Sequence, residues 1–156
     1  MDNYSADPFL PEDPEILLQQ RKINNVPVML GFTKDEGKFW TSRLDSDQVF
    51  AEKFKKNWDT CGPINILGKE SSNITESDVD FINSLVANYD NDGGTESAEH
   101  LTNVFSDAVF SFSTHKVSQY LVNSGNKLVF KYFFAYSGNY ISYIYNSVSQ
   151  ICLEEN

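Results

Sequence analysis

The sequence predicts an α/β fold in which two buried strands flank a long helical region. Two short and almost continuous apolar runs, at residues 26–33 and 127–136, have the length and composition of strands. Between them, apolar residues recur at helical spacing in several segments. Such runs are typical of parallel strands that helices cover on both faces. With 156 residues, of which 40% are hydrophobic and 14% aromatic, the chain can bury a core.

The first helix is expected from Pro14 to about Arg21. Asp13 is a good N-cap, and proline suits the first helical position. The run VPVMLGFT, residues 26–33, then predicts a buried strand. Pro27 is tolerated only near the beginning of such a strand or at a sheet edge.

The next helix is expected in DQVFAEKFKKNW, residues 47–58, where apolar residues line one side and lysines the other. Gly62 and Pro63 follow it, and both residues interrupt helices. Residues 61–73 are therefore expected to form a loop. Thr75 and Asp78 then match a capping box in which Asp replaces the preferred Glu, which predicts a further helix.

The longest periodic region, residues 99–123, follows the polar and glycine-bearing linker NYDNDGGTES. Ser106 or Asp107 is expected to interrupt this helical region, because both residue types prefer caps to helix interiors. Gly125 ends it, and the run KLVFKYFFAY, residues 127–136, predicts the second strand.

Two parallel strands do not form a stable sheet by themselves. We therefore expect the sheet to continue in sequence outside this chain, which indicates part of a larger domain. Without further strands, the apolar faces of the two strands would lack complete cover, and exposed faces of this kind promote self-association. The residues concerned are Val26, Val28, Leu30, Val129, Phe130, Phe133 and Phe134.

The charge of the chain argues against two classes of partner. Twelve basic and 22 acidic residues give a net charge of −10, so a phosphate backbone or an anionic membrane surface would repel the protein. No apolar run approaches the ~20 residues that span a bilayer. We expect no nucleic acid partner, no membrane span and, from the first 15 residues, no signal peptide, which leaves localisation open.

Cys61 and Cys152 lie far apart and show no metal-binding spacing, while a disulfide between them stays possible. We expect neither a metal nor a cofactor. Asn3 and Asn73 begin glycosylation sequons, which matter only if the chain enters the secretory route.

The segment FLPEDPEILLQQRKINNVPVMLGFTKDEG, residues 9–37, carries an ordered set of motifs. It resembles the part of type-B carboxylesterases, the cholinesterase-like family that includes insect carboxylesterases and juvenile hormone esterases, that leads to the triad acid. The family has an acidic Leu-Pro-x-Asp-Pro segment, a short helix, a Val-Pro-Val strand, a glycine and an Asp-Glu-Gly turn. The matching residues here are Leu10 to Pro14, Val26 to Val28, Gly31, and Asp35 to Gly37.

The resemblance covers about residues 6–138, and the tail 139–156 departs from the family pattern. Later segments resemble the family's helical insert and its last core strand, which ends in Ser and Gly. Residues 1–156 are thus expected to form a partial type-B carboxylesterase domain with a partial α/β-hydrolase fold, namely two core parallel strands with a helical insert between them.

By this resemblance, Glu36 occupies the acid position of a Ser-Glu-His triad. A carboxylate in that position accepts from one imidazole nitrogen and steadies the imidazolium that forms when the other nitrogen takes the serine proton. Asp35 is expected to be a turn residue, and Gly37 is expected to give the backbone room to turn.

The other triad members are not identifiable in this sequence. The Gly-x-Ser-x-Gly elbow, which precedes the acid in this fold, is absent, and residues 136–139 do not match it. No histidine follows His115, although the family base comes after the last core strand. His100 and His115 both lie in the predicted insert and are expected to be surface or helix-packing residues. The isolated chain is therefore expected not to hydrolyse esters.

Three functional interpretations remain. The first is a carboxylic ester hydrolase of which this chain is the acid-bearing portion, and the second is a non-catalytic, cholinesterase-like interaction module that binds a basic partner. The third is an unrelated α/β domain, which would be favoured if the two strands were not neighbours in one parallel sheet. For the first, no substrate can be named beyond a small carboxylic ester. Phe39, Trp40 and Phe112 can line a pocket, but such aromatics are more often core residues.

Overall fold

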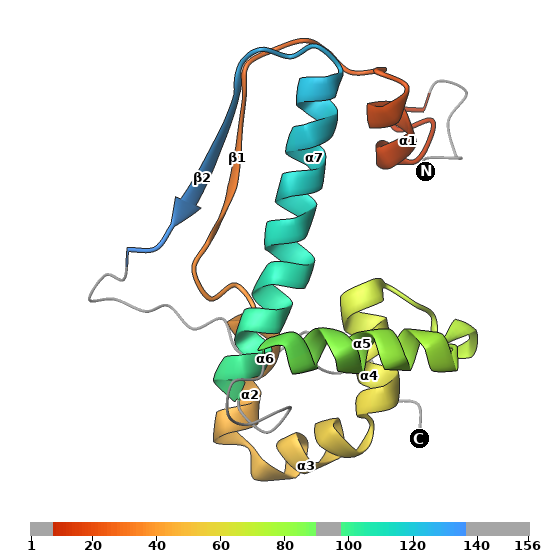
Figure 1. The fold of residues 1–156 in the computed structure, drawn as a ribbon, viewed down its shortest axis with the longest axis vertical. Coiled ribbons are helices and arrows are strands. Elements are labelled where there is room, and N and C mark those ends of the chain that lie inside the picture. The colour runs from red at the N-terminus through yellow and green to blue at the C-terminus, as the bar shows by residue number, and fades with distance from the viewer. Residues whose placement is uncertain (1–7, 90–97, 137–156) are drawn as a thin grey trace.

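The computed structural model describes residues 8–89 and 98–136. Two strands run side by side along one long helix, and the other helices of the insert gather beyond one end of the sheet (Figure 1). The elements are, in order, α1 (Pro14–Gln19), β1 (Val28–Thr33), α2 (Lys38–Ser46), α3 (Gln48–Lys56), α4 (Trp58–Leu67), the 3-10 turn η1 (Ser71–Asn73), α5 (Glu76–Tyr89), α6 (Ala98–Phe105), the π-helical segment η3 (Ser106–Ser111), α7 (Phe112–Asn123) and β2 (Val129–Phe134).

The two strands pair in parallel, with Val28 opposite Val129 and Thr33 opposite Phe134. This is the predicted arrangement. An unrelated α/β domain would have been favoured if the two strands were not neighbours in one parallel sheet, and they are neighbours. The observed strands are slightly shorter than the apolar runs, since β1 spans Val28–Thr33 and β2 spans Val129–Phe134.

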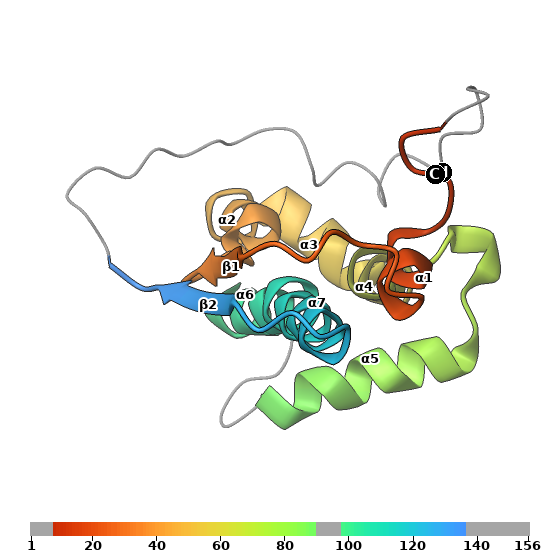
Figure 2. The same cartoon turned by 90° about the horizontal axis from the view of Figure 1, so that it is seen from above.

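The two faces of the sheet differ in their cover. One face carries Val28, Leu30 and Val129, which are partly buried, and α7 packs against both strands. The opposite face, which we call the open face, carries Met29, Phe130, Tyr132 and Phe134, and these side chains are between 49% and 73% exposed. The view from above shows the insert helices beside the sheet rather than around it (Figure 2). Phe133, on the face toward α7, is also 59% exposed, so neither face has complete cover, as expected.

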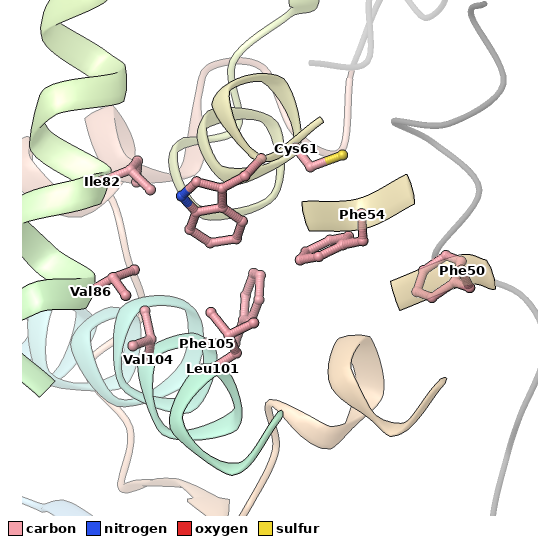
Figure 3. Close-up of a cluster of buried hydrophobic side chains, with 9 residues drawn as sticks. Phe50, Phe54, Cys61, Ile82, Val86, Leu101, Val104 and Phe105 are labelled. Atoms are coloured by element: carbon pink, nitrogen blue, oxygen red, sulfur yellow. The ribbon is translucent and has the colours of Figure 1, made fainter. Parts of the chain in front are cut away.

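The core lies inside the helical insert. Figure 3 shows its side chains converging from several helices. Val104 and Phe105 on α6 are completely buried, and Ile82 on α5 is 1% exposed. The nine buried members of this cluster are Phe50, Phe54, Trp58, Cys61, Ile82, Val86, Leu101, Val104 and Phe105.

Local signals predicted several element boundaries correctly. Asp13 caps α1 by accepting from the Glu15 N–H at 2.7 Å, although the helix ends at Gln19 rather than near Arg21. Thr75 and Asp78 form the reciprocal capping box: Asp78 Oδ2 accepts from the Thr75 N–H at 2.9 Å, and Thr75 Oγ1 accepts from the Asp78 N–H at 3.3 Å. These Thr75 hydrogen bonds, with support from Lys69, lower the pKa of Asp78.

The predicted interruption near Ser106 or Asp107 is present, as the π-helical segment η3 between α6 and α7. The predicted loop at residues 61–73 is wrong over its first part, because α4 continues through Gly62 and Pro63 to Leu67. Pro63 cannot donate the helical hydrogen bond, and the loss costs about 3 kcal/mol in an exposed helix. Burial offsets it here, since both residues lie in the core.

Gly62 itself is the close contact between α4 and α5. A Cβ at this position would lie 2.9 Å from Ile82 Cγ2 and 3.3 Å from two atoms of the Trp58 ring. Gly62 therefore indicates a helix interruption in the local sequence, but in the folded chain it permits close packing of α4 against α5. The helix ends instead at Gly68, whose φ of 65° is the left-handed conformation that favours glycine.

Some expectations lie outside the described residues. These are the divergent tail 139–156, most of the polar linker, Cys152 and the sequon at Asn3. Cys61 is fully buried in the core. Asn73, in the second sequon, is exposed at the end of η1. No helix in the described ranges is long and apolar enough to cross a membrane.

Candidate active-site turn

A tight turn joins the carboxyl end of β1 to the first turn of α2 and carries Glu36. The strand ends at Thr33, and the Lys34 N–H still donates to the Phe134 carbonyl of β2 at 2.8 Å. Helix α2 begins at Lys38. The turn is therefore held between a paired strand and a helix, which is the kind of rigid support that a functional side chain needs.

The carboxylate of Glu36 is oriented by the last residue of the strand. Its Oε1 accepts two hydrogen bonds from Thr33, one from the backbone N–H at 2.8 Å and one from the hydroxyl at 2.9 Å. Within residues 8–89 and 98–136, Oε2 has no hydrogen-bond partner. One oxygen is thus fixed by the strand, and the other is available to accept from a further donor such as an imidazole N–H.

Asp35 has a structural role in this turn. Its φ of 62° places it in the left-handed region, which Asp tolerates better than most residues. Its carboxylate forms an ion pair with Lys38 Nζ at 3.0 Å. Asp35 therefore shapes the turn, as its type and position predict.

Gly37 was expected to give the backbone room to turn, and the structure shows which neighbour limits that room. Its φ of −59° and ψ of −16° are ordinary helical values that any residue adopts. A Cβ on Gly37, however, would lie 2.1 Å from the Thr102 carbonyl oxygen of α6. The glycine therefore allows the turn to approach α6 closely, and the left-handed conformation is supplied by Asp35.

The aromatic side chains after the turn divide between core and surface. Trp40 stacks on Phe105 at 5.4 Å between ring centroids and packs against the core. Phe39 contacts Trp40 edge to face and is 49% exposed. Phe112 is 61% exposed and lines a hollow of about 530 Å³ between α4, α5, η3 and α7.

Neither histidine pairs with Glu36 in the described part of the chain. His100 Nε2 lies 3.0 Å from the Val86 carbonyl oxygen, and its ring contacts Tyr89. His115 lies on α7 and lines the hollow beside Phe112. Both are located in the helical insert, as the sequence predicts.

Two groups around the turn were not singled out from the sequence. Thr33 is the donor to Glu36, and the available signal was a hydroxyl residue at the strand end, three positions before the acid. Ser106 accepts from the Gly37 N–H at 2.9 Å across 69 positions of sequence. Its sequence signal indicated a helix interruption and not a bond to the turn.

Across the described ranges, no group of three or more His, Cys, Asp and Glu side chains is arranged to hold a metal ion. What the turn offers chemically is one oriented carboxylate with an oxygen available to a donor.

The architecture, two parallel strands joined through a helical insert with a carboxylate at the carboxyl end of the first, corresponds to part of an α/β hydrolase. The model of the carboxylesterase family matches residues 2–153. The chain belongs to the carboxylesterase family.

Its relatives include insect esterases. The chain is 29% identical over 140 residues to esterase E4 of Myzus persicae, which covers 87% of this chain and 24% of the relative. It is 26% identical over 130 residues to the juvenile hormone esterase of Heliothis virescens, which covers 83% of this chain and 22% of the relative. The chain thus spans about a quarter of the length of these relatives. No solved structure gives a significant match.

Proposed function

We propose that this chain is the acid-bearing portion of a serine-dependent carboxylic ester hydrolase, and that Glu36 is its triad acid. The observation that carries the proposal is the Glu36 carboxylate, with Oε1 held by Thr33 and Oε2 available. Family membership supports the ester hydrolase class. Relatives named as esterases support small carboxylic esters as the class of substrate.

The proposed role follows from the geometry of the carboxylate. In a triad, the acid accepts the N–H of an imidazole whose second nitrogen removes the proton from serine. A carboxylate that turned freely would lose orientational control of that imidazole. The two hydrogen bonds from Thr33 limit this rotation, so Oε2 presents its lone pairs in a defined direction.

The isolated chain is proposed to be inactive. Its sequence contains no Gly-x-Ser-x-Gly elbow and no histidine after β2, so it lacks an identifiable nucleophile and base. A fluorophosphonate reagent should leave the purified chain unlabelled, and hydrolysis of p-nitrophenyl esters should equal the buffer rate. Stoichiometric labelling of a serine in this chain would refute the proposal of inactivity.

The role of Glu36 is tested in the native polypeptide that carries this sequence. An antibody to residues 1–40 identifies that polypeptide and gives its mass, which is compared with the 17.7 kDa of this chain. In a larger polypeptide that hydrolyses esters, Glu36→Gln should lower kcat by about 10⁴-fold, because the amide no longer stabilises the imidazolium.

Asp35→Asn is the matched control, because it removes the neighbouring carboxylate of the same turn. Asp35 pairs with Lys38 at the surface and shapes the backbone, so this variant should keep kcat within a few fold of the parent. Equal activity of the Glu36→Gln variant and the parent would refute the triad role. Equal losses in the two variants would also refute it, since they would indicate a general disturbance of the turn.

A further inference from the structure

Ser106 connects the turn that carries Glu36 to the helical insert. The N–H of Gly37 belongs to the peptide bond directly after Glu36, and it donates to Ser106 Oγ at 2.9 Å. The Ser106 hydroxyl in turn donates to the Thr102 carbonyl oxygen at 2.6 Å. The hydroxyl therefore accepts from the turn and donates to the helix, which gives it a definite orientation.

The backbone on both sides of this contact has little freedom. Gly37 is buried, and the Thr102 carbonyl lies where a Cβ of residue 37 would be. The Thr41 hydroxyl on α2 contacts the Thr102 hydroxyl and lies 3.2 Å from the Gly37 carbonyl oxygen. Thr41 and Thr102 are only 1% and 4% exposed. Helix α6 thus meets the turn through buried, hydrogen-bonded groups.

Glu36 is consequently held at two points, its carboxylate and the peptide that follows it, by residues from different parts of the fold. Thr33 on β1 holds its Oε1. Ser106, at the first position of η3, holds the peptide that follows its Cα. A carboxylate attached to a backbone that is anchored on both sides can point in few directions, which is the requirement for orienting an imidazole.

We propose that Ser106 is a positioning residue for Glu36, through which the helical insert sets the direction of the carboxylate. The functional part of this inference rests on the proposed role of Glu36 as triad acid. The structural part stands alone, because it concerns hydrogen bonds within this chain. It also assigns a purpose to the π-helical segment, since π-segments frequently occur at functional sites.

The first test is amide NMR on the full 156-residue chain. In the parent, the Gly37 amide should exchange slowly with solvent. The Thr33 amide, which donates to the Glu36 carboxylate, should also exchange slowly. Ser106→Ala should speed exchange at Gly37 by roughly five- to tenfold, the value of one hydrogen bond, and should speed exchange at Thr33 by a smaller factor.

Two further variants separate positioning from general stability. Ser106→Thr retains the hydroxyl and should restore both signals. Ser111→Ala, the matched control, removes a hydroxyl at the opposite end of η3 whose side chain forms no hydrogen bond within residues 8–89 and 98–136. It should leave both signals unchanged, and the core amides of Ile82 and Val86 should stay protected in all three variants.

Several results would overturn the inference. A fast-exchanging Gly37 amide in the parent chain would show that the bond to Ser106 is not formed, and this readout needs no variant. Parent-like exchange at the Thr33 amide in Ser106→Ala would show that the bond does not orient Glu36. The same change in Ser111→Ala would assign the effect to η3 as a whole. If Ser106→Ala does not fold, exchange at the Gly37 amide of the parent chain and of Ser106→Thr decides whether the bond to Ser106 is formed.

A kinetic arm uses the ester-hydrolysing polypeptide that carries this sequence. Ser106→Ala should lower kcat by roughly 10- to 100-fold with little change in KM, as expected for a slightly misplaced group. Added to Glu36→Gln it should cost nothing more, because it acts through that residue. Full additivity would contradict positioning. An active Glu36→Gln enzyme would refute the triad role alone, since the NMR test still decides the structural link.

Discussion

The helical insert and the two-stranded sheet hold their apolar side chains in opposite ways. In the insert, Val104 and Phe105 have no exposed surface, and aromatic rings stack through the cluster. On the open face of the sheet, Met29 is 73% exposed and Phe130 is 53% exposed. The insert therefore obtains most of its stability from its own packing, whereas the sheet relies on α7 and leaves one apolar face for another contact.

The Glu36 turn lies where these two regions meet. It is attached to the sheet through Thr33 and Phe134, and to the insert through Ser106 and Thr102. A well-packed insert can hold the turn in place even when the sheet has an open face. The comparison thus indicates that the helical insert is the main support of the Glu36 turn. Four experiments test the difference between the insert and the sheet.

The largest effect is expected from Phe105→Ala in the insert. Phe105 is completely buried and stacks on Trp40, so its truncation leaves a cavity and should cost about 3–5 kcal/mol of unfolding free energy. Phe130→Ala on the open face is the counterpart and should cost less than half as much, because its ring is already 53% exposed. Urea unfolding followed by circular dichroism measures both. Equal losses would mean that the two regions are stabilised alike.

A smaller effect is expected from adding one methyl group to the sheet. Gly31 lies opposite Tyr132, and a Cβ there would be 2.2 Å from the Tyr132 carbonyl oxygen. Gly31→Ala should therefore separate the strands locally at a cost of about 1–3 kcal/mol. Hydrogen exchange should become faster at the Val28 and Lys34 amides, which donate to the carbonyls of Leu128 and Phe134.

Gly62→Ala in the insert is the control for this substitution. Its new methyl group would meet side-chain atoms of Ile82 and Trp58, which are able to shift, and alanine has the better helix propensity by about 1 kcal/mol. Its loss in urea unfolding should be smaller than that of Gly31→Ala. The reverse order would show that the sheet tolerates strain better than the insert.

A smaller free-energy change is expected from a substitution that weakens self-association through the open face. The isolated chain is predicted to form oligomers, and Phe130→Lys should weaken them roughly tenfold by placing a charge where about half of a phenylalanine surface is available for burial. Sedimentation velocity over a range of concentrations measures the change. Val49→Lys, on the exposed side of α3, should leave association unaltered. A parent chain that stays monomeric at all concentrations would contradict the prediction.

The smallest effect is a pH dependence of the insert. Burial and the neighbouring Asp107 carboxylate, which accepts from the Tyr89 hydroxyl at 2.7 Å, raise the pKa of Tyr89 to about 12 from its ordinary 10.0. A raised pKa in the folded state means that the stabilisation is complete below pH 10 and is lost as the pH rises toward 12. Urea midpoints should fall more over this interval for the parent than for Tyr89→Phe. Identical slopes would exclude a contribution from this pair.

Short-range signals predicted most of the elements correctly. The strands followed from apolar runs, α1 from Asp13 and Pro14, and α5 from the capping box. Each of these signals acts within a few residues, so the sequence around it contains the physical cause. Helix α2 was not predicted, because it begins after Gly37 without a capping side chain.

Short-range sequence signals predicted only part of the candidate site. The resemblance to the carboxylesterase pattern predicted Glu36 as the acid, and the structure adds the hydrogen bonds of Thr33 to its carboxylate and of Ser106 to the peptide after it. The sequence predicted that Gly37 gives the backbone room, but it could not identify the neighbour that requires this, because Thr102 is remote in sequence. A glycine that permits close approach and one that permits a left-handed turn look the same in a sequence.

By itself, the sequence determined the α/β class, the two strands, the family resemblance and the acid at the end of the first strand, because runs, caps and motifs are local. The tertiary structure alone decided that α4 continues through Gly62 and Pro63, which face of the sheet α7 packs against, and that Ser106 bonds to the Glu36 turn. These features depend on burial and on contacts between remote segments, whose free energies exceed local preferences of about 1–3 kcal/mol per residue.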